Sequence, residues 1–204
     1  MHPLAKALKA TPDRKTRFHT ARGELIGWRG IADLPVAVVR RLRPAPEPWM
    51  VRDAVRFLDR AIRPEWVVLE LGSGASTAWF AARAKSVLSF ENDPAWHHRV
   101  SAPANCRIEL ASLEDTLLRV QGMPDDSFDL VVVDSNEEPG IGRVDFARAA
   151  ASKVRHGGLL VFDDLDREEH PAGDSLFADW EAHRFIGIKG QPLTTLETSI
   201  FRRT

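Results

Sequence analysis

Acidic residues lie within or directly after four apolar runs of this sequence, and a glycine-rich turn follows the first of these runs. Glu70 comes two residues before the turn Gly72-Ser-Gly74, and Glu91 ends the next run. Asp134 ends a third run, and the pair Asp163-Asp164 ends a fourth. Carboxylates can accept hydrogen bonds from hydroxyl groups, hold an ammonium group, act as a general base or bind Mg2+. These residues are the first candidates for a binding or catalytic site.

The glycine turn connects a strand-like run to a helix-like stretch. We expect Gly72 and Gly74 to let the backbone turn sharply and approach a bound molecule. Ser76 or Thr77 can cap the helix or donate hydrogen bonds. Glu91, 17 residues beyond Gly74, is expected at the carboxyl end of the neighbouring strand. A ribose would sit there, and a carboxylate can accept hydrogen bonds from two of its hydroxyl groups.

Strand-like and helix-like segments alternate along the chain beyond residue 50. The strand-like runs are 66–71, 86–90, 107–110, 128–133 and 158–162, and the helix-like stretches are 50–62, 76–84, 94–101, 114–121 and 143–154. This alternation predicts an α/β fold, in which helices cover both faces of a mostly parallel sheet. Two further alternating runs, at 184–189 and 196–201, predict a terminal antiparallel hairpin. Because parallel strands end at one edge, the acids after the third and fourth runs should gather there.

The composition is typical of a soluble globular protein, with 44% hydrophobic and 28% charged residues among 204. No run reaches 18 apolar residues, so we expect no membrane span and a cytoplasmic location. Residues 1–45 carry ten Lys and Arg against three Asp and Glu, and a proline-rich stretch, 43–48, follows them. We therefore expect a basic N-terminal extension, 1–45, and a single domain, 46–204.

The basic extension has several possible partners. It can dock on its own acidic domain, or it can meet nucleic acid, an anionic membrane surface or a phosphorylated substrate. Nucleic acid is the unlikely choice, because Phe18 and Trp28 are the only aromatic residues among these basic ones. Trp49, just beyond the prolines, could cover a ligand or anchor the core, and the sequence favours the core.

In the order of its motifs, the chain resembles the class I S-adenosylmethionine-dependent methyltransferases. Glu70-Leu-Gly-Ser-Gly74 resembles the first motif of that family, Glu91 its ribose-binding acid and Asp134 the acid after its fourth strand. Over about residues 46–203, the chain resembles a subgroup of small bacterial methyltransferase-like proteins. The segments that carry this resemblance are 48–49, 72–77, 91–96, 128–134 with Arg143 downstream, 157–164 and 198–201.

The resemblance implies a Rossmann-like sheet of seven strands and a set of cofactor contacts. The turn with Gly72, Ser73, Gly74 and Thr77 would lie against the methionine part of S-adenosylmethionine, whose amino group Glu70 would support. The remaining contacts would be Glu91 at the ribose, Ser112 and Leu113 beside the adenine, and Asp134 at the methionine end, and Asn92 would also contact the cofactor. The chain departs from the subgroup at 135–140, where a glycine usually follows the acid.

These residues predict methyl transfer from S-adenosylmethionine to an oxygen or nitrogen of a small molecule or glycan. The catalytic base would be Asp134 or Asp163. Asp134 with Asp163-Asp164 is also similar to the metal-binding acids of catechol-type O-methyltransferases, which have Asp-Asn where this chain has Asp-Asp. Dependence on a divalent metal is therefore an option, although no residue is assigned as a ligand.

Two alternatives stay open at this stage. An NAD-dependent oxidoreductase also has a glycine turn followed by an acid, but Thr77 replaces its third glycine and the terminal hairpin does not fit it. A binding module that keeps the cofactor pocket without catalysis would account for the departure at 135–140.

Overall fold

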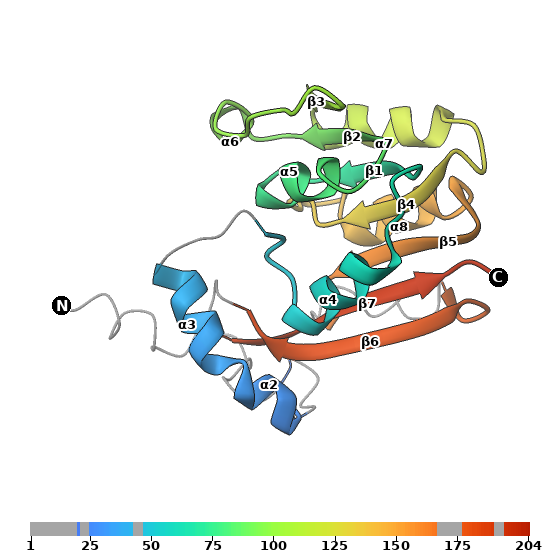
Figure 1. Ribbon diagram of the computed structural model, residues 1–204. Helices are drawn as coiled ribbons and strands as arrows, with labels where there is room; N and C mark the ends of the chain where they lie inside the picture. The colour runs from blue at the N-terminus through green and yellow to red at the C-terminus, as the bar shows by residue number, and fades with distance from the viewer. Residues whose placement is uncertain (1–19, 21–24, 43–46, 167–176, 190–193) are drawn as a thin grey trace.

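The computed structural model describes residues 20, 25–42, 47–166, 177–189 and 194–204, and these form a single seven-stranded sheet with helices on both sides (Figure 1). The strands are β1 Val67–Leu71, β2 Ser86–Glu91, β3 Cys106–Leu110, β4 Phe128–Val133, β5 Val154–Asp163, β6 Glu181–Ile188 and β7 Thr195–Arg202. Their order is β3-β2-β1-β4-β5-β7-β6. The first five run parallel, and β7 is antiparallel to both of its neighbours. The predicted Rossmann-like sheet with its terminal antiparallel hairpin is confirmed.

Two layers of helices cover the sheet. The domain helices are α4 Arg52–Ala61, α5 Ala75–Ala81, α6 Pro94–His97, α7 Leu113–Gly122 and α8 Arg143–Ala151. Successive side chains of a strand point to opposite faces, so each central strand contributes to two cores. Because both faces are covered, β1 and β4 can be apolar at nearly every position. None of the helices in the described ranges is long and apolar enough to cross a membrane.

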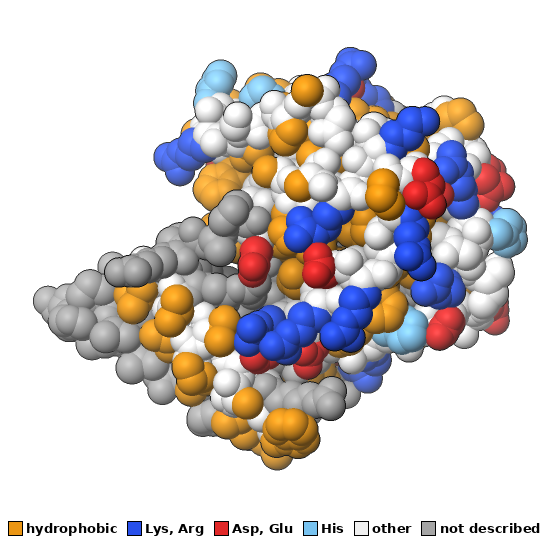
Figure 2. All heavy atoms as spheres, in the orientation of Figure 1, with side chains coloured by type: hydrophobic (Ala, Val, Ile, Leu, Met, Phe, Trp, Pro, Cys, Tyr) orange, Lys and Arg blue, Asp and Glu red, His pale blue; other side chains and the backbone are white. Residues whose placement is uncertain are grey.

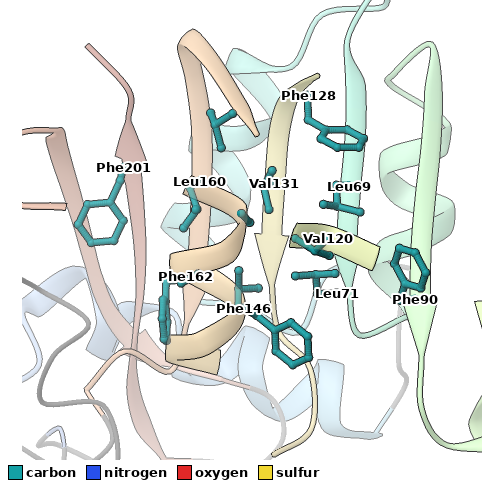
Figure 3. Close-up of a cluster of buried hydrophobic side chains, with 14 of the residues drawn as sticks. Leu69, Leu71, Phe90, Val120, Phe128, Val131, Phe146, Leu160, Phe162 and Phe201 are labelled. Atoms are coloured by element: carbon teal, nitrogen blue, oxygen red, sulfur yellow. The ribbon is translucent and has the colours of Figure 1, made fainter. Parts of the chain in front are cut away.

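On one face, α7 and α8 pack against β1, β4 and β5. Figure 3 shows this core, in which Leu69, Val131 and Leu160 from the strands meet Val120 of α7 and Phe146 of α8. All five side chains are inaccessible to solvent. On the other face, α4 and α5 cover the alternate residues of the same strands. The two cores hold the strand ends, and thus the residues that follow them, in fixed positions.

Strand β5 begins at Val154, four residues earlier than the sequence pattern predicts. The pairing of β5 with β4 shifts register between Phe128 and Leu130, which admits the extra residues as a bulge. Gly157 has a φ of 77°, and a Cβ on Gly158 would lie 2.9 Å from the carbonyl oxygen of Asp129. The strand therefore includes Val154, which the pattern placed at the end of a helix. Helix α6 is also shorter than predicted and ends at His97.

The N-terminal part contains two helices that the sequence analysis did not predict, α2 Trp28–Ala32 and α3 Leu34–Leu42. They dock at the edge of the sheet through a small apolar cluster of Ile26, Ala37 and Ile188. An ion pair joins Asp33 to Arg52 of α4 at 2.6 Å. In this pair the extension contributes the acid and the domain contributes the base, although the extension as a whole is basic and the domain is acidic. Most of the basic residues of the extension lie outside the described residues.

Candidate active site

A cleft of about 370 Å3 opens at the carboxyl edge of the sheet, where β1 and β4 lie side by side. The chain reverses its direction of winding between these two strands, and ligands of open α/β sheets bind at such points. The residues that line the cleft are Trp49, the turn 72–76, Glu91, Asp93, Trp96, Asp134, Asn136, Arg143, Asp163, Asp164 and Lys189. The expectation that the acids after the strands gather at one edge is confirmed.

The turn after β1 depends on Gly72. Its φ is 100°, a left-handed conformation that favours glycine, and its N–H donates to the carbonyl oxygen of Phe90 at 2.9 Å. A Cβ at this position would lie 2.6 Å from the carbonyl oxygen of Asp134. Gly74 was also expected to allow a sharp turn of the backbone. Its φ of 178° is instead extended backbone, and a Cβ there would meet only ordinary contacts. Only the first glycine is therefore required by the backbone.

Glu70 lies beneath the turn and is inaccessible to solvent. Its carboxylate accepts hydrogen bonds from Ser76 at 2.5 Å, Thr77 at 2.6 Å and Ser89 at 2.7 Å. Burial raises the pKa of Glu70 to about 7, against the opposing effect of these three hydrogen bonds. Thr77 also accepts a hydrogen bond from the N–H of Gly74 at 2.9 Å. Glu70 and Thr77 thus connect β1, α5 and β2, and neither is on the cleft wall.

Glu91 ends β2 and reaches the cleft beside the turn. One carboxylate oxygen accepts from the N–H and the hydroxyl of Ser73, both at 3.0 Å. The other accepts from the N–H groups of Asn92 and Asp93 at 2.9 and 2.8 Å. These four donors fix the side chain in place and leave it only 4% exposed.

Two tryptophans flank the glycine turn. The indole N–H of Trp96 donates to the carbonyl oxygen of Ser73 at 2.7 Å. Trp49 packs edge-on against Trp96, with ring centroids 5.9 Å apart. The preference for Trp49 as a core anchor is wrong, because the residue is 43% exposed and lines the cleft. Its ring packs against Trp96 at the cleft wall instead.

Asp134 directly follows β4, and its N–H donates to the carbonyl oxygen of Leu71. Its carboxylate pairs with Arg143 at 3.0 Å, and its side chain remains 28% exposed. Arg143 also donates to the carbonyl oxygens of Ser135 and Asp163, both at 2.8 Å. This buried guanidinium therefore connects the loops after β4 and β5. Burial raises the pKa of Asp134, while the charges of Arg143 and Lys189 oppose the change.

Asp163 ends β5, Asp164 follows it, and both hold the ammonium group of Lys189. Lys189 forms ion pairs with both carboxylates, and Asp163 also accepts from the hydroxyl of Thr198 at 2.5 Å. Burial, together with the charges of Asp164 and Asp134, raises the pKa of Asp163 to about 7 despite the ammonium group beside it. Asp163 is therefore less available to a ligand than Asp134.

The cleft includes some predicted residues and omits others. Gly72, Ser73, Gly74, Glu91, Asp134 and Asp163 line it. Ser112 caps α7 through a hydrogen bond to the N–H of Asp115, Leu113 is buried in the core, and Asn92 accepts from Asn136 at 3.3 Å. The cofactor contacts and catalytic roles predicted for all of these residues, and for Glu70 and Thr77, stay predictions. The sequence analysis did not predict Lys189 as a residue of the site. One signal for it was present, because the predicted strand 184–189 is largely apolar and ends in this lysine.

The sheet order, the glycine turn after the first strand and the acid after the second define a Rossmann-like enzyme that binds a nucleoside-containing cofactor. The profile of a family described as a methyltransferase domain matches residues 69–165. These residues thus form a methyltransferase domain, and the resemblance to the class I S-adenosylmethionine-dependent methyltransferases found in the sequence is confirmed. No curated protein sequence matched the chain.

Solved structures share the fold at low sequence identity. An O-methyltransferase from Bacillus cereus in complex with SAH is 14% identical, with a TM-score of 0.57 over 87% of this chain and 92% of its own. Cofactor-bound Rv0187 from MTB is 18% identical, with a TM-score of 0.56 over 87% and 92%. The O-methyltransferase TomG from Streptomyces achromogenes, in complex with SAM and involved in tomaymycin synthesis, is 17% identical, with a TM-score of 0.54 over 85% and 80%.

Proposed function

We propose that the protein transfers the methyl group of S-adenosylmethionine to an oxygen or nitrogen of a small molecule or glycan. The observation that carries this proposal is the meeting of Gly72, Glu91 and Asp134 in one cleft at the reversal point of the sheet. The cleft volume lies within the range of about 300–1,000 Å3 typical of small-molecule sites. The O-methyltransferases among the solved structures of this fold favour a hydroxyl acceptor.

Glu91 is proposed to bind the ribose hydroxyl groups. A carboxylate has about four positions for hydrogen-bond donors, and those of Glu91 are filled by its own chain. The hydroxyl of Ser73 is the donor that can leave by rotation about its side-chain bond, whereas the three backbone N–H groups are held by the turns. We therefore expect Ser73 to change rotamer when a ribose binds.

The acidic end of the cleft is proposed to receive the acceptor. S-adenosylmethionine supplies a methyl group already activated by its sulfonium, so the chain has to align the acceptor and take up its proton. Asp134 is better placed for this than Asp163, because it is more exposed and lacks the ammonium partner. Burial raises its pKa, which makes it a stronger base than an exposed carboxylate. Asp163, which lines the same cleft, is proposed to share that proton.

Thermal unfolding with separate ligands tests the cofactor. A ligand at 100 times its dissociation constant adds about 2.7 kcal/mol to the free energy of unfolding. We expect S-adenosylmethionine and S-adenosylhomocysteine to raise the unfolding temperature and NADH to leave it unchanged. Stabilisation by NADH alone would instead favour the oxidoreductase alternative.

The variant Glu91→Ala tests the ribose contact. We expect S-adenosylhomocysteine to bind at least tenfold more weakly, a loss of about 1.4 kcal/mol, measured by titration calorimetry. Glu109→Ala is the matched control, because Glu109 lies on the neighbouring strand β3 and pairs with Arg107 and Arg119 away from the cleft. Unchanged affinity in Glu91→Ala would remove Glu91 from the cofactor site.

A cofactor-binding module without catalysis is the second candidate. The observation in its favour is that Asp163, one of the two proposed bases, is already held by Lys189 and Thr198. The two candidates differ in turnover. Production of S-adenosylhomocysteine with any member of a panel of phenols, alcohols, amines and sugars would rule out the binding module.

A further inference from the structure

Lys189 is a charged residue of the cleft wall to which the proposed reaction assigns no role. It follows β6, which runs parallel to β5 because both are antiparallel to β7. The carboxyl ends of β5 and β6 therefore lie at the same edge of the sheet, and the side chain of Lys189 reaches Asp163 and Asp164 from the far strand. Lys189 is only 3% exposed.

The ammonium group of Lys189 lies between the carboxylates of Asp163 and Asp164. Its Nζ contacts Oδ2 of Asp163, and Oδ1 of Asp164 at 2.5 Å. Asp134 lines the same cleft and pairs with Arg143 at 3.0 Å. The nearest guanidinium nitrogen of Arg143 is 3.7 Å from Asp164. One ammonium thus joins the two acids after β5.

The three acids are the donor type that Mg2+, Mn2+ and Ca2+ prefer, and their similarity to the acids of metal-dependent methyltransferases raises the question of a metal. The arrangement does not fit one. Among the described residues, no group of three or more His, Cys, Asp and Glu side chains is placed to hold a metal ion. A divalent cation between Asp163 and Asp164 would have to displace the ammonium of Lys189, which both carboxylates already hold.

We infer that the ammonium group of Lys189 is the built-in cation of this site and holds the acids after β4 and β5 together in place of a divalent metal. Lys189 is thus a positioning residue that keeps Asp163 and Asp164 beside Asp134. The inference deepens the proposed function, since it concerns the acceptor end of the same cleft. It means that methyl transfer needs no added metal ion.

Binding of Mn2+ tests this inference on the full chain without cofactor. We measure the electron paramagnetic resonance signal of free Mn2+ during a titration, and thermal unfolding with and without Mn2+. The wild-type protein should leave both unchanged. Lys189→Ala removes the ammonium and leaves the carboxylates facing one another, so it should unfold at a lower temperature. It should also bind one Mn2+ at least tenfold more tightly than the wild type and regain unfolding temperature with it.

Two further variants locate the effect. Adding Asp164→Asn to Lys189→Ala should abolish the gained Mn2+ binding, because one of the carboxylates is lost. Lys153→Ala is the matched control, since Lys153 is also buried and pairs with a carboxylate, Asp125 at 2.7 Å, outside the cleft wall. It should gain no Mn2+ binding. A loss of stability without Mn2+ binding is what a merely structural role of Lys189 would produce.

The inference is overturned if the wild type binds one Mn2+ and Asp164→Asn loses it, or if a folded Lys189→Ala gains no affinity. If Lys189→Ala folds only with Mn2+, the inference is supported. If Lys189→Ala does not fold at all, Lys189→Gln takes its place and is expected to bind Mn2+ in the same way. If neither variant folds, the Mn2+ titration of the wild-type protein decides the question. Because no cofactor is present, these outcomes are separate from any failure of the proposed methyl transfer.

Discussion

The carboxyl group of Glu70 is enclosed by Ser76, Thr77 and Ser89, and it joins the three elements on which the glycine turn rests. The three hydroxyl groups can all donate hydrogen bonds to a charged carboxylate, or one of them can accept a hydrogen bond from a protonated carboxyl group. With a pKa of about 7, the group is mostly protonated in mildly acid solution and mostly charged above neutral pH. The packing of the turn is therefore linked to pH.

Replacing Glu70 by Gln should reduce the dependence of stability on pH. Between about pH 4.5 and 7, the folded state keeps a proton that the unfolded state releases, so wild-type stability should fall as the pH rises through this range. The loss is at most about 3 kcal/mol. Urea unfolding from pH 5 to 8 measures this loss as the difference in stability between wild type and Glu70→Gln. Asp163 also has a raised pKa, but its contribution is the same in both proteins and cancels. Parallel curves for wild type and Glu70→Gln would contradict the raised pKa.

Between elements, the turn from β1 to α5 and the end of β4 are in direct contact. Gly72 lies against the backbone of Asp134, whose N–H is itself bonded to the carbonyl oxygen of Leu71. Neither segment can move away without breaking the pairing of β1 with β4. The close approach places the turn and the acidic end of the cleft at a fixed separation, as transfer between two ligands in line requires.

Gly72→Ala should therefore be costly. The new Cβ would meet the Asp134 carbonyl oxygen at 2.6 Å, in a backbone conformation that L residues rarely adopt. We expect a loss of at least about 2 kcal/mol in urea unfolding, together with weaker S-adenosylhomocysteine binding. Gly122→Ala at the end of α7, where a Cβ meets nothing within 4 Å, should be neutral or stabilising by up to about 1 kcal/mol. Equal stabilities of the two variants would show that the turn can relax.

At the scale of the whole molecule, the two cores of the sheet are large and the cluster that docks the N-terminal helices is small. In Figure 2, hydrophobic side chains remain visible over α2 and α3, and basic side chains lie over α4. Trp28 and Leu25 are among the exposed large hydrophobic residues of this region. We propose that the N-terminal part is an appendage of a domain that begins near residue 46.

The appendage can be tested by comparing two truncated core side chains. Leu160→Ala in the central sheet should lower the free energy of unfolding by about 2–5 kcal/mol. Ile26→Ala should change it much less, because a small satellite cluster can open locally without unfolding the domain. Urea unfolding gives both values, and hydrogen exchange should show faster exchange confined to 25–42 in Ile26→Ala. A similar global loss in both variants would instead make the helices part of the cooperative domain.

The order of apolar runs determined the α/β fold, because strands covered on both faces must be apolar at nearly every position. It also placed Glu91, Asp134 and Asp163 correctly at one edge, since parallel strands all end on the same side. The short motif Gly72-Ser-Gly74 indicated the turn, and only the structure separated the glycine that the backbone requires from the one that it does not.

Long-range contacts were decided by tertiary structure alone. The sequence contained Lys189 at the end of a strand, but its partners Asp163 and Asp164 became neighbours only because β7 inserts between β5 and β6 and makes those two strands parallel. Burial likewise separated Glu70, which is enclosed beneath the turn, from Glu91, which reaches the cleft. Local pattern determines which residues end strands, whereas strand order and burial determine which of those residues meet and which remain charged.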